Sequence, residues 1–279
     1  MATQQAGHPY HMVEPRPWPV VGSIAAGVVA FGLIWFMHDV TPWVLPLGLL
    51  FVAWVMYVWW KDVVNEATFQ KAHSKVTQLG LRYGMALFIS SEVMFFFAWF
   101  WAFFNAALYP TPQMGGTWPP SSPEIGVEVF NPWGIPLLNT LILLTSGLTV
   151  TWAHHGLRKG DKQTLIRGLL LTVVLGAIFT GFQAYEYLHA PFHFTGGIFG
   201  TTFFMATGFH GAHVIIGTVF LAVCLVRASK DHFTADHHFG FEAAAWYWHF
   251  VDVVWLFLFT FIYWWTSVQP AAHIASHGG

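Results

Sequence analysis

Five ionisable side chains lie near the middle of long apolar segments: Glu92, His210, His213, His249 and Asp252. A charged side chain at the centre of a bilayer costs about 2.5–3.5 kcal/mol on insertion scales. Residues three apart on a helix share a face, so His210 with His213, and His249 with Asp252, should point into protein. A facing histidine or hydroxyl would hold the carboxyl groups by hydrogen bonds, and the hydroxyl candidates are Ser90, Ser91 and Thr207.

Three kinds of chemistry fit these residues. The histidines could ligate a haem or a metal ion, although the same helices offer no second histidine pair as multi-haem membrane cytochromes require. Glu92 could be the proton-binding carboxylate of an independent membrane carrier, although its neighbours Val93–Phe97 form an apolar wall. In the third interpretation, which we favour, these groups form a buried polar core between helices, each hydrogen bond contributing about 0.6–2 kcal/mol.

The remaining histidines give weaker signals for metal binding. His154 with His155, and His237 with His238, are adjacent in sequence, and adjacent residues do not share a helix face. His189 and His193 could hold a metal ion at the surface, but solvated histidine is the simpler interpretation. The single cysteine, Cys224, excludes an internal disulfide, a four-thiolate zinc site and an iron–sulfur cluster. We therefore predict no metal or other cofactor in this chain.

The elements that position these residues must lie in lipid. Of the 279 residues, 56% are hydrophobic and only 9% are charged, whereas soluble domains are about 25% charged. A net charge of -2 gives no basic surface for nucleic acid. Seven continuous apolar runs have the length of about 20 residues that a spanning helix needs, and none alternates as a β-barrel strand would. We predict one all-α polytopic membrane domain over residues 1–279, with spans at Trp18–Met37, Pro42–Trp60, Leu79–Tyr109, Ile135–His155, Thr164–Leu188, Ile198–Arg227 and Phe241–Trp265.

Basic residues orient these spans. The eleven lie in the N-terminal segment and around the second, fourth and sixth connections: Arg16; Lys61, Lys71, Lys75 and Arg82; Arg158, Lys159, Lys162 and Arg167; Arg227 and Lys230. The positive-inside rule then places the N-terminus inside and the C-terminus outside, which requires an odd number of spans. Within the first span, Gly22, Ala26 and Ala30 have the small-residue spacing that lets a second helix approach closely.

Several long motifs resemble subunit III of cytochrome c oxidase, a family of the haem–copper oxidases. They are Ser91–Phe96, Trp99–Phe103, Trp152–His155, Ala206–Gly217 and His238–Trp255, joined by the shorter matches Tyr10–Val13, Pro17–Pro19, Trp59–Val63 and Trp118–Pro120. The resemblance extends from about residue 8 to about residue 267. The sequence departs from the family pattern in the basic connection Thr68–Lys75 and in the tail Ala271–Gly279.

The resemblance implies a seven-helix subunit of a proton-pumping oxidase in the aerobic respiratory chain. In this family helices one and two splay from helices three to seven, and structural phospholipids occupy the cleft. The haems and copper belong to partner subunits: subunit I reduces oxygen and is the main contact, and subunit II receives electrons from cytochrome c. The first two spans favour the cytochrome c branch over quinol oxidases. We expect a bacterial cell (inner) membrane rather than a mitochondrial one.

The resemblance also implies roles for particular residues. Glu92 matches the family's buried, carbodiimide-reactive carboxyl group, and Trp60, His213 and Arg227 match positions that bind lipid. The family supports proton uptake into subunit I and stabilises the oxygen-reducing core. Histidines on the inner surface could collect protons for that uptake, and the candidates are His11, His237 and His238. No catalytic residue is expected in this chain.

Overall fold

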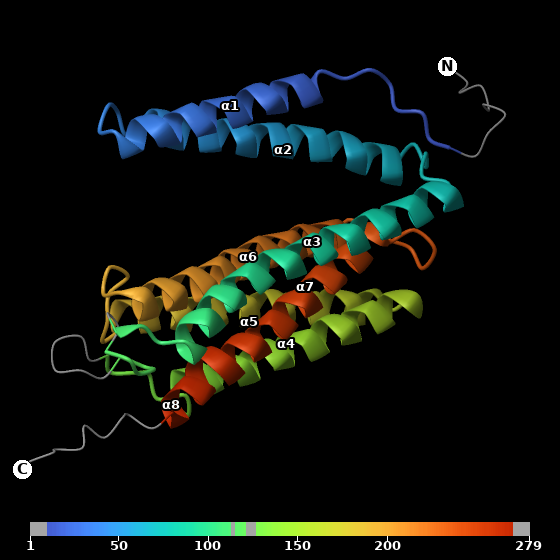
Figure 1. Ribbon diagram of the computed structural model, residues 1–279. Coiled ribbons are helices and arrows are strands. Elements are labelled where there is room, and N and C mark those ends of the chain that lie inside the picture. The colour runs from blue at the N-terminus through green and yellow to red at the C-terminus, as the bar shows by residue number, and fades with distance from the viewer. Residues whose placement is uncertain (1–9, 113–114, 121–126, 270–279) are drawn as a thin grey trace, which may run out of the picture. The chain divides into compact units, whose positions relative to one another are not determined.

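All regular secondary structure is helical over the residues that the structure describes. The structure is a computed structural model describing residues 10–112, 115–120 and 127–269, so the tail after residue 269 lies outside it. Its helices are α1 (Trp18–Met37), α2 (Val44–Thr68), α3 (Lys75–Leu108), α4 (Ile135–Arg158), α5 (Lys162–Leu188), α6 (Ile198–Ser229), α7 (Phe239–Phe257), the π-helix η2 (Leu258–Trp265) and α8 (Thr266–Val268) (Figure 1). Seven segments are long and apolar enough to cross a membrane, the last combining α7, η2 and α8. The prediction of an all-α chain with seven spans is confirmed.

Helix α2 extends well beyond its predicted end at Trp60. Its last two turns run from Lys61 to Thr68, where the sequence becomes polar. Arg16 pairs with Glu66 and lies 3.8 Å from Asp62, whose carboxylate also accepts a 2.7 Å hydrogen bond from the Trp18 indole. The apolar run that predicts the span ends at the first charged residue, Lys61. The helix continues beyond it because these side-chain contacts stabilise its last two turns.

The chain divides into two compact units, Met1–Leu81 and Arg82–Gly279. In the first unit α1 and α2 pack closely where glycines leave room. A Cβ atom on Gly32 would lie 2.7 Å from the backbone nitrogen of Leu45, and one on Gly48 would lie 3.0 Å from that of Val29. The predicted small-residue stripe is wrong in register, because Ala26 and Ala30 are exposed while Ala25 is fully buried. The contact lies on the neighbouring face of α1.

The second unit is built on α4, α5, α6 and α7 (Figure 1). Helix α4 packs on α5, α5 on α6, α6 on α7, and α7 returns to α4. Two fully buried tryptophans of α7 cross to α4, since the indole of Trp248 donates to the Ser146 hydroxyl and that of Trp255 to the Thr140 hydroxyl, both at 2.9 Å. Glycine lets α5 approach α4: a Cβ atom on Gly168 would lie 2.7 Å from the Ala153 Cβ. Small residues and paired indoles thus fix this core.

Candidate functional site

The structure brings Glu92 of α3 together with His213 of α6. Their Oε2 and Nε2 atoms lie 2.8 Å apart, and the other ring nitrogen of His213 donates to the carbonyl of Phe209 at 2.6 Å. Since Nδ1 carries a proton in that arrangement, Nε2 either accepts from a protonated Glu92 or, in an imidazolium, donates to a carboxylate. Both states carry no net charge. The pair can therefore hold a mobile proton without placing an uncompensated charge in lipid.

Aromatic rings surround the His213 imidazole. Phe96 lies 5.0 Å from it between ring centroids, and Tyr247 stacks at 6.2 Å with an interplanar angle of 18°. Phe95 packs edge-on against Phe209, 4.9 Å away. The Glu92 side chain is half-buried at the edge of this aromatic group. The surroundings are apolar, so the hydrogen bond to His213 is the polar contact that the structure records for this carboxyl group.

The predicted hydroxyl partners do not serve the carboxyl groups. Ser90 and Ser91 donate to the carbonyls of Ala86 and Phe88 within their own helix. Thr207 instead receives a 2.6 Å hydrogen bond from the Tyr187 hydroxyl. Serine and threonine commonly bond back to the preceding turn of a helix, which satisfies them locally. This expectation about the hydroxyl groups was wrong, and a facing histidine takes their place.

His210 lies away from the Glu92–His213 pair although it is only three residues from His213. Its Nε2 donates to the Val251 carbonyl at 3.1 Å, and its ring packs between Phe179 of α5 and Trp255 of α7. It is 1% exposed. His210 therefore ties α6 to the backbone of α7, which agrees with the packing interpretation. Because His213 uses both ring nitrogens in contacts with protein, the arrangement gives no support to haem ligation by these two residues.

His249 and Asp252 form a second polar group between α7 and α4. Nδ1 of His249 lies 3.3 Å from Oδ2 of Asp252, and its Nε2 lies 3.1 Å from the Thr151 hydroxyl. Gly147 of α4 makes room for the carboxyl group, because a Cβ atom there would meet Asp252. Asp252 is buried, whereas 45% of the His249 side chain is exposed. A polar group thus reaches the outer surface of the second unit at the middle of a span.

Of the three residues matched to lipid binding, His213 is the partner of Glu92, whereas Trp60 lies on an exposed face and Arg227 lies near a helix end. Trp60 is exposed on α2, where it helps to line an apolar cavity of about 150 Å³ with Trp59 and Val55. Arg227 lies in the last turn of α6, and its guanidinium stands 4.4 Å from the ring centroid of Phe233. The guanidinium also abuts Gly240, where a Cβ atom would come within 2.7 Å of Nη1. Gly240 thus leaves room for the guanidinium, which rests against the Phe233 ring.

The predicted proton-collecting histidines have different surroundings. His237 is exposed in the connection between α6 and α7, while His238 is half-buried. Nε2 of His238 lies 3.3 Å from Nε2 of His154, a contact that sequence reasoning missed. In the same connection, burial and the neighbouring Arg227 lower the pKa of His232. His11 belongs to the first unit, where it lies beside His73.

Two more polar contacts escaped sequence reasoning. Arg82 donates two hydrogen bonds to Oε2 of Glu242, at 2.9 and 3.0 Å, joining α3 to α7. Glu186, near the end of α5, is 2% exposed and accepts a 2.5 Å hydrogen bond from the Tyr263 hydroxyl. Gln183, one turn earlier, also donates to it. The spacing of Gln183 and Glu186 on one helix face was the available signal.

Comparisons with known proteins agree with the sequence motifs. The sequence model of the family described as "Cytochrome c oxidase subunit III" matches residues 8–267. Proteins named "Cytochrome c oxidase subunit 3" are similar over nearly their whole length. Those of Cyprinus carpio and Scyliorhinus canicula are 56% and 58% identical, each over 93% of this chain and 98% of the relative. That of Marchantia polymorpha is 57% identical over 92% of this chain and 97% of the relative.

Proposed function

Because this chain belongs to the cytochrome c oxidase subunit III family, we propose that it is a non-catalytic subunit that binds subunit I and structural phospholipids. The chain is an integral membrane subunit of a respiratory oxidase, and partner subunits of that complex carry haem and copper. Its proposed contribution is to support proton uptake and to stabilise the oxygen-reducing core. We also propose that the complex resides in a bacterial cell membrane.

The polar group at His249 carries the proposal that subunit I covers the surface formed by α4 and α7. Both ring nitrogens of His249 already have protein partners, but the half-exposed imidazole still presents a polar surface at the middle of a span, where acyl chains solvate it poorly. A neighbouring protein helix covers such a surface more favourably, because polar residues in membranes stabilise contacts between helices. Thr151 and Asp252 already hold the His249 ring in one orientation. This surface therefore suits a protein neighbour better than lipid.

Photocrosslinking tests this interface. A benzoyl-phenylalanine at Leu148, which is 72% exposed on α4 one turn from Thr151, should form an adduct with subunit I in the intact oxidase. The matched control places benzoyl-phenylalanine at Val219, which is 58% exposed on α6. It should react mainly with lipid. If subunit I is captured from Val219 and not from Leu148, the proposed interface is wrong.

Arg227 supports the proposed binding of a phospholipid headgroup. A guanidinium can hold a phosphate by two parallel hydrogen bonds while its stem lies along apolar surface. The contact with Phe233 orients the guanidinium before any lipid binds, in space that Gly240 leaves open, and this reduces the entropy lost on binding. Simple attraction of a cation to the inner membrane surface is the competing explanation, and it would require only the charge.

Substitutions at Arg227 distinguish these explanations. Arg227→Ala should remove phospholipid from the purified complex and shorten its lifetime during turnover, because hydrogen bonds to charged groups contribute about 1.5–3 kcal/mol, or at least ~10-fold in affinity. Arg227→Lys should lose most of the same lipid, since lysine keeps the charge without the paired donors. Lys230→Ala removes an exposed cation nearby and should retain the lipid. Lipid content that mass spectrometry finds equal in all three variants would reject the headgroup site.

Proton uptake is the third part of the proposed function. His237 and His238 lie together in one connection, and His154 extends that group toward the end of α4. Imidazoles exchange protons near neutral pH, so such a group can gather protons at a surface. The Glu92–His213 pair lies deeper, within α3 and α6, and supports this proposal only by its ability to hold a proton.

A further inference from the structure

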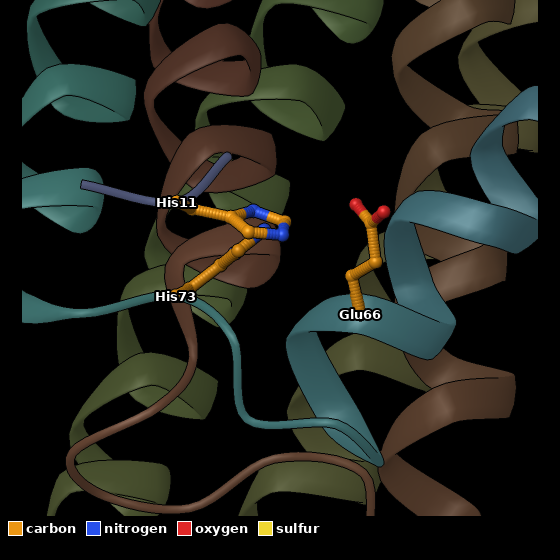
Figure 2. A group of neighbouring side chains, drawn as sticks. All are labelled: His11, Glu66 and His73. Carbon is orange, nitrogen blue, oxygen red and sulfur yellow. The ribbon is translucent and has the colours of Figure 1, made fainter. Parts of the chain in front are cut away.

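Three metal-binding side chains from three separate segments meet in the first unit. His11 comes from the segment before α1, Glu66 from the last turns of α2, and His73 from the connection between α2 and α3. Each offers one ligand atom, and these atoms all lie within 4.8 Å of one another. Figure 2 shows the two imidazole rings beside each other with the carboxylate facing them. We propose that His11, Glu66 and His73 form a binding site for a zinc-class divalent metal ion.

The donor set selects this class of ion. Two imidazoles and one carboxylate suit zinc and related transition metals, whereas calcium and magnesium prefer oxygen ligands alone. Zinc bonds to nitrogen and oxygen are about 2.0–2.2 Å long. A cation centred among three atoms 4.8 Å apart is about 2.8 Å from each, so each ligand needs to move by only about 0.7 Å. Rotation of the long side chains can supply that movement, and water can complete a tetrahedral shell.

The surroundings of the cluster also favour a cation. Arg16 binds one oxygen of Glu66, which orients the carboxylate and leaves its second oxygen for a metal ion. Such outer contacts commonly hold metal-binding carboxylates in position. Asp62 lies 3.8 Å from the same guanidinium, so the two acids and one arginine carry a net charge of about -1 before a metal binds. The carbonyl of His73 accepts a hydrogen bond from Gln78, which anchors that part of the connection.

The sequence does not reveal this cluster, because its spacing pattern indicates only pairs of histidines on the same helix, and His11, Glu66 and His73 come from three segments. His11 and His73 are far apart in the chain, yet their ring centroids lie 5.7 Å apart. A metal ion bound to all three residues would join the N-terminal segment to the end of α2 and to the connection that follows it. The expected effect of the ion is structural: it holds the N-terminal segment against these two parts of the first unit.

Zinc binding to the intact oxidase tests the site. After chelator washing, equilibrium dialysis with radioactive zinc should show one ion fewer per complex, or at least ~10-fold weaker binding of one ion, in His11→Asn and in His73→Asn. Both substitutions leave the Arg16–Glu66 ion pair in place. His237→Asn alters an exposed histidine of the second unit and should bind as the wild type does. Unchanged zinc binding in His11→Asn and His73→Asn would overturn the proposal.

Hydrogen exchange gives a second readout that a surface contaminant ion would not produce. Zinc should slow exchange of the backbone amides around residues 10–16 in the wild-type complex. It should have no such effect in His73→Asn, although that residue is distant in sequence from the amides measured. Protection of the N-terminal segment by zinc in both proteins would show that the ion does not bridge His11 to His73, and the proposed site would be wrong.

Discussion

Replacing Gly168 by leucine is expected to prevent α5 from packing on α4 and to remove this subunit from the purified oxidase. A Cβ atom at this position would lie 2.7 Å from the Cβ of Ala153 and 2.9 Å from the carbonyl oxygen of Thr149. One of these atoms belongs to the backbone and cannot turn aside. Overpacking a core by extra methylenes costs about 1–3 kcal/mol, and displacement of a helix costs more. The subunit content and thermal stability of the complex measure the effect.

Gly181→Leu is the matched control on the same helix. No atom lies within 4 Å of a Cβ built at Gly181, and the residue is exposed. Leucine has the better helix propensity by up to ~1 kcal/mol, so this variant should assemble as well as the wild type. If both variants lose the subunit equally, the defect comes from leucine in α5 generally, and the close contact at Gly168 is not its cause.

Glu92→Gln is expected to abolish labelling of this chain by a hydrophobic carbodiimide while leaving oxygen reduction largely intact. The reagent attacks a protonated carboxyl group in an apolar setting, and glutamine has no carboxyl group to offer. The amide of glutamine can still donate to Nε2 of His213, so the contact between α3 and α6 should persist. Labelling is measured by mass spectrometry of the subunit, and turnover by oxygen consumption.

The control for this experiment is Glu14→Gln, which alters an exposed carboxyl group outside the spans. It should leave carbodiimide labelling unchanged. Continued labelling of the Glu92→Gln chain would place the reactive group elsewhere. Complete loss of turnover in an assembled Glu92→Gln complex would contradict the proposed non-catalytic role, because oxygen reduction would then depend on this side chain.

The number and approximate bounds of the spans could be predicted because transfer into lipid demands about 20 apolar residues at a time. Which face of each span contacts another helix, and which faces lipid, could not be predicted. Ala25 is buried while Ala26 is exposed, yet both are apolar and either would suit lipid or a helix neighbour. In a soluble protein, polarity would separate these faces, but a membrane removes that signal. The positions of helix contacts therefore depend on side-chain packing, which the distribution of apolar residues along the sequence does not reveal.

The candidate site shows a similar division. Depth alone indicated that Glu92 and His213 needed partners, and the structure makes them partners of each other although 121 residues separate them. The same reasoning paired His210 with His213, whose rings instead serve different neighbours. The spacing of two residues along one helix determines only roughly the direction in which their side chains point. Partners on other helices are set by the tertiary arrangement, and the buried Glu186–Tyr263 contact was missed for the same reason.

The π-helix η2 determines the directions in which the side chains at the end of the last span point. A π-helix winds more residues into each turn than an α-helix does, so side chains after Leu258 emerge at different angles from those that α7 alone would give. At these angles Tyr263 reaches Glu186, and Phe261 lies 5.1 Å from Phe104. Loss of a single residue within η2 would leave Trp248 and Trp255 in place but rotate Tyr263 about the helix axis. The end of this helix is consequently sensitive to chain length as well as to side-chain chemistry.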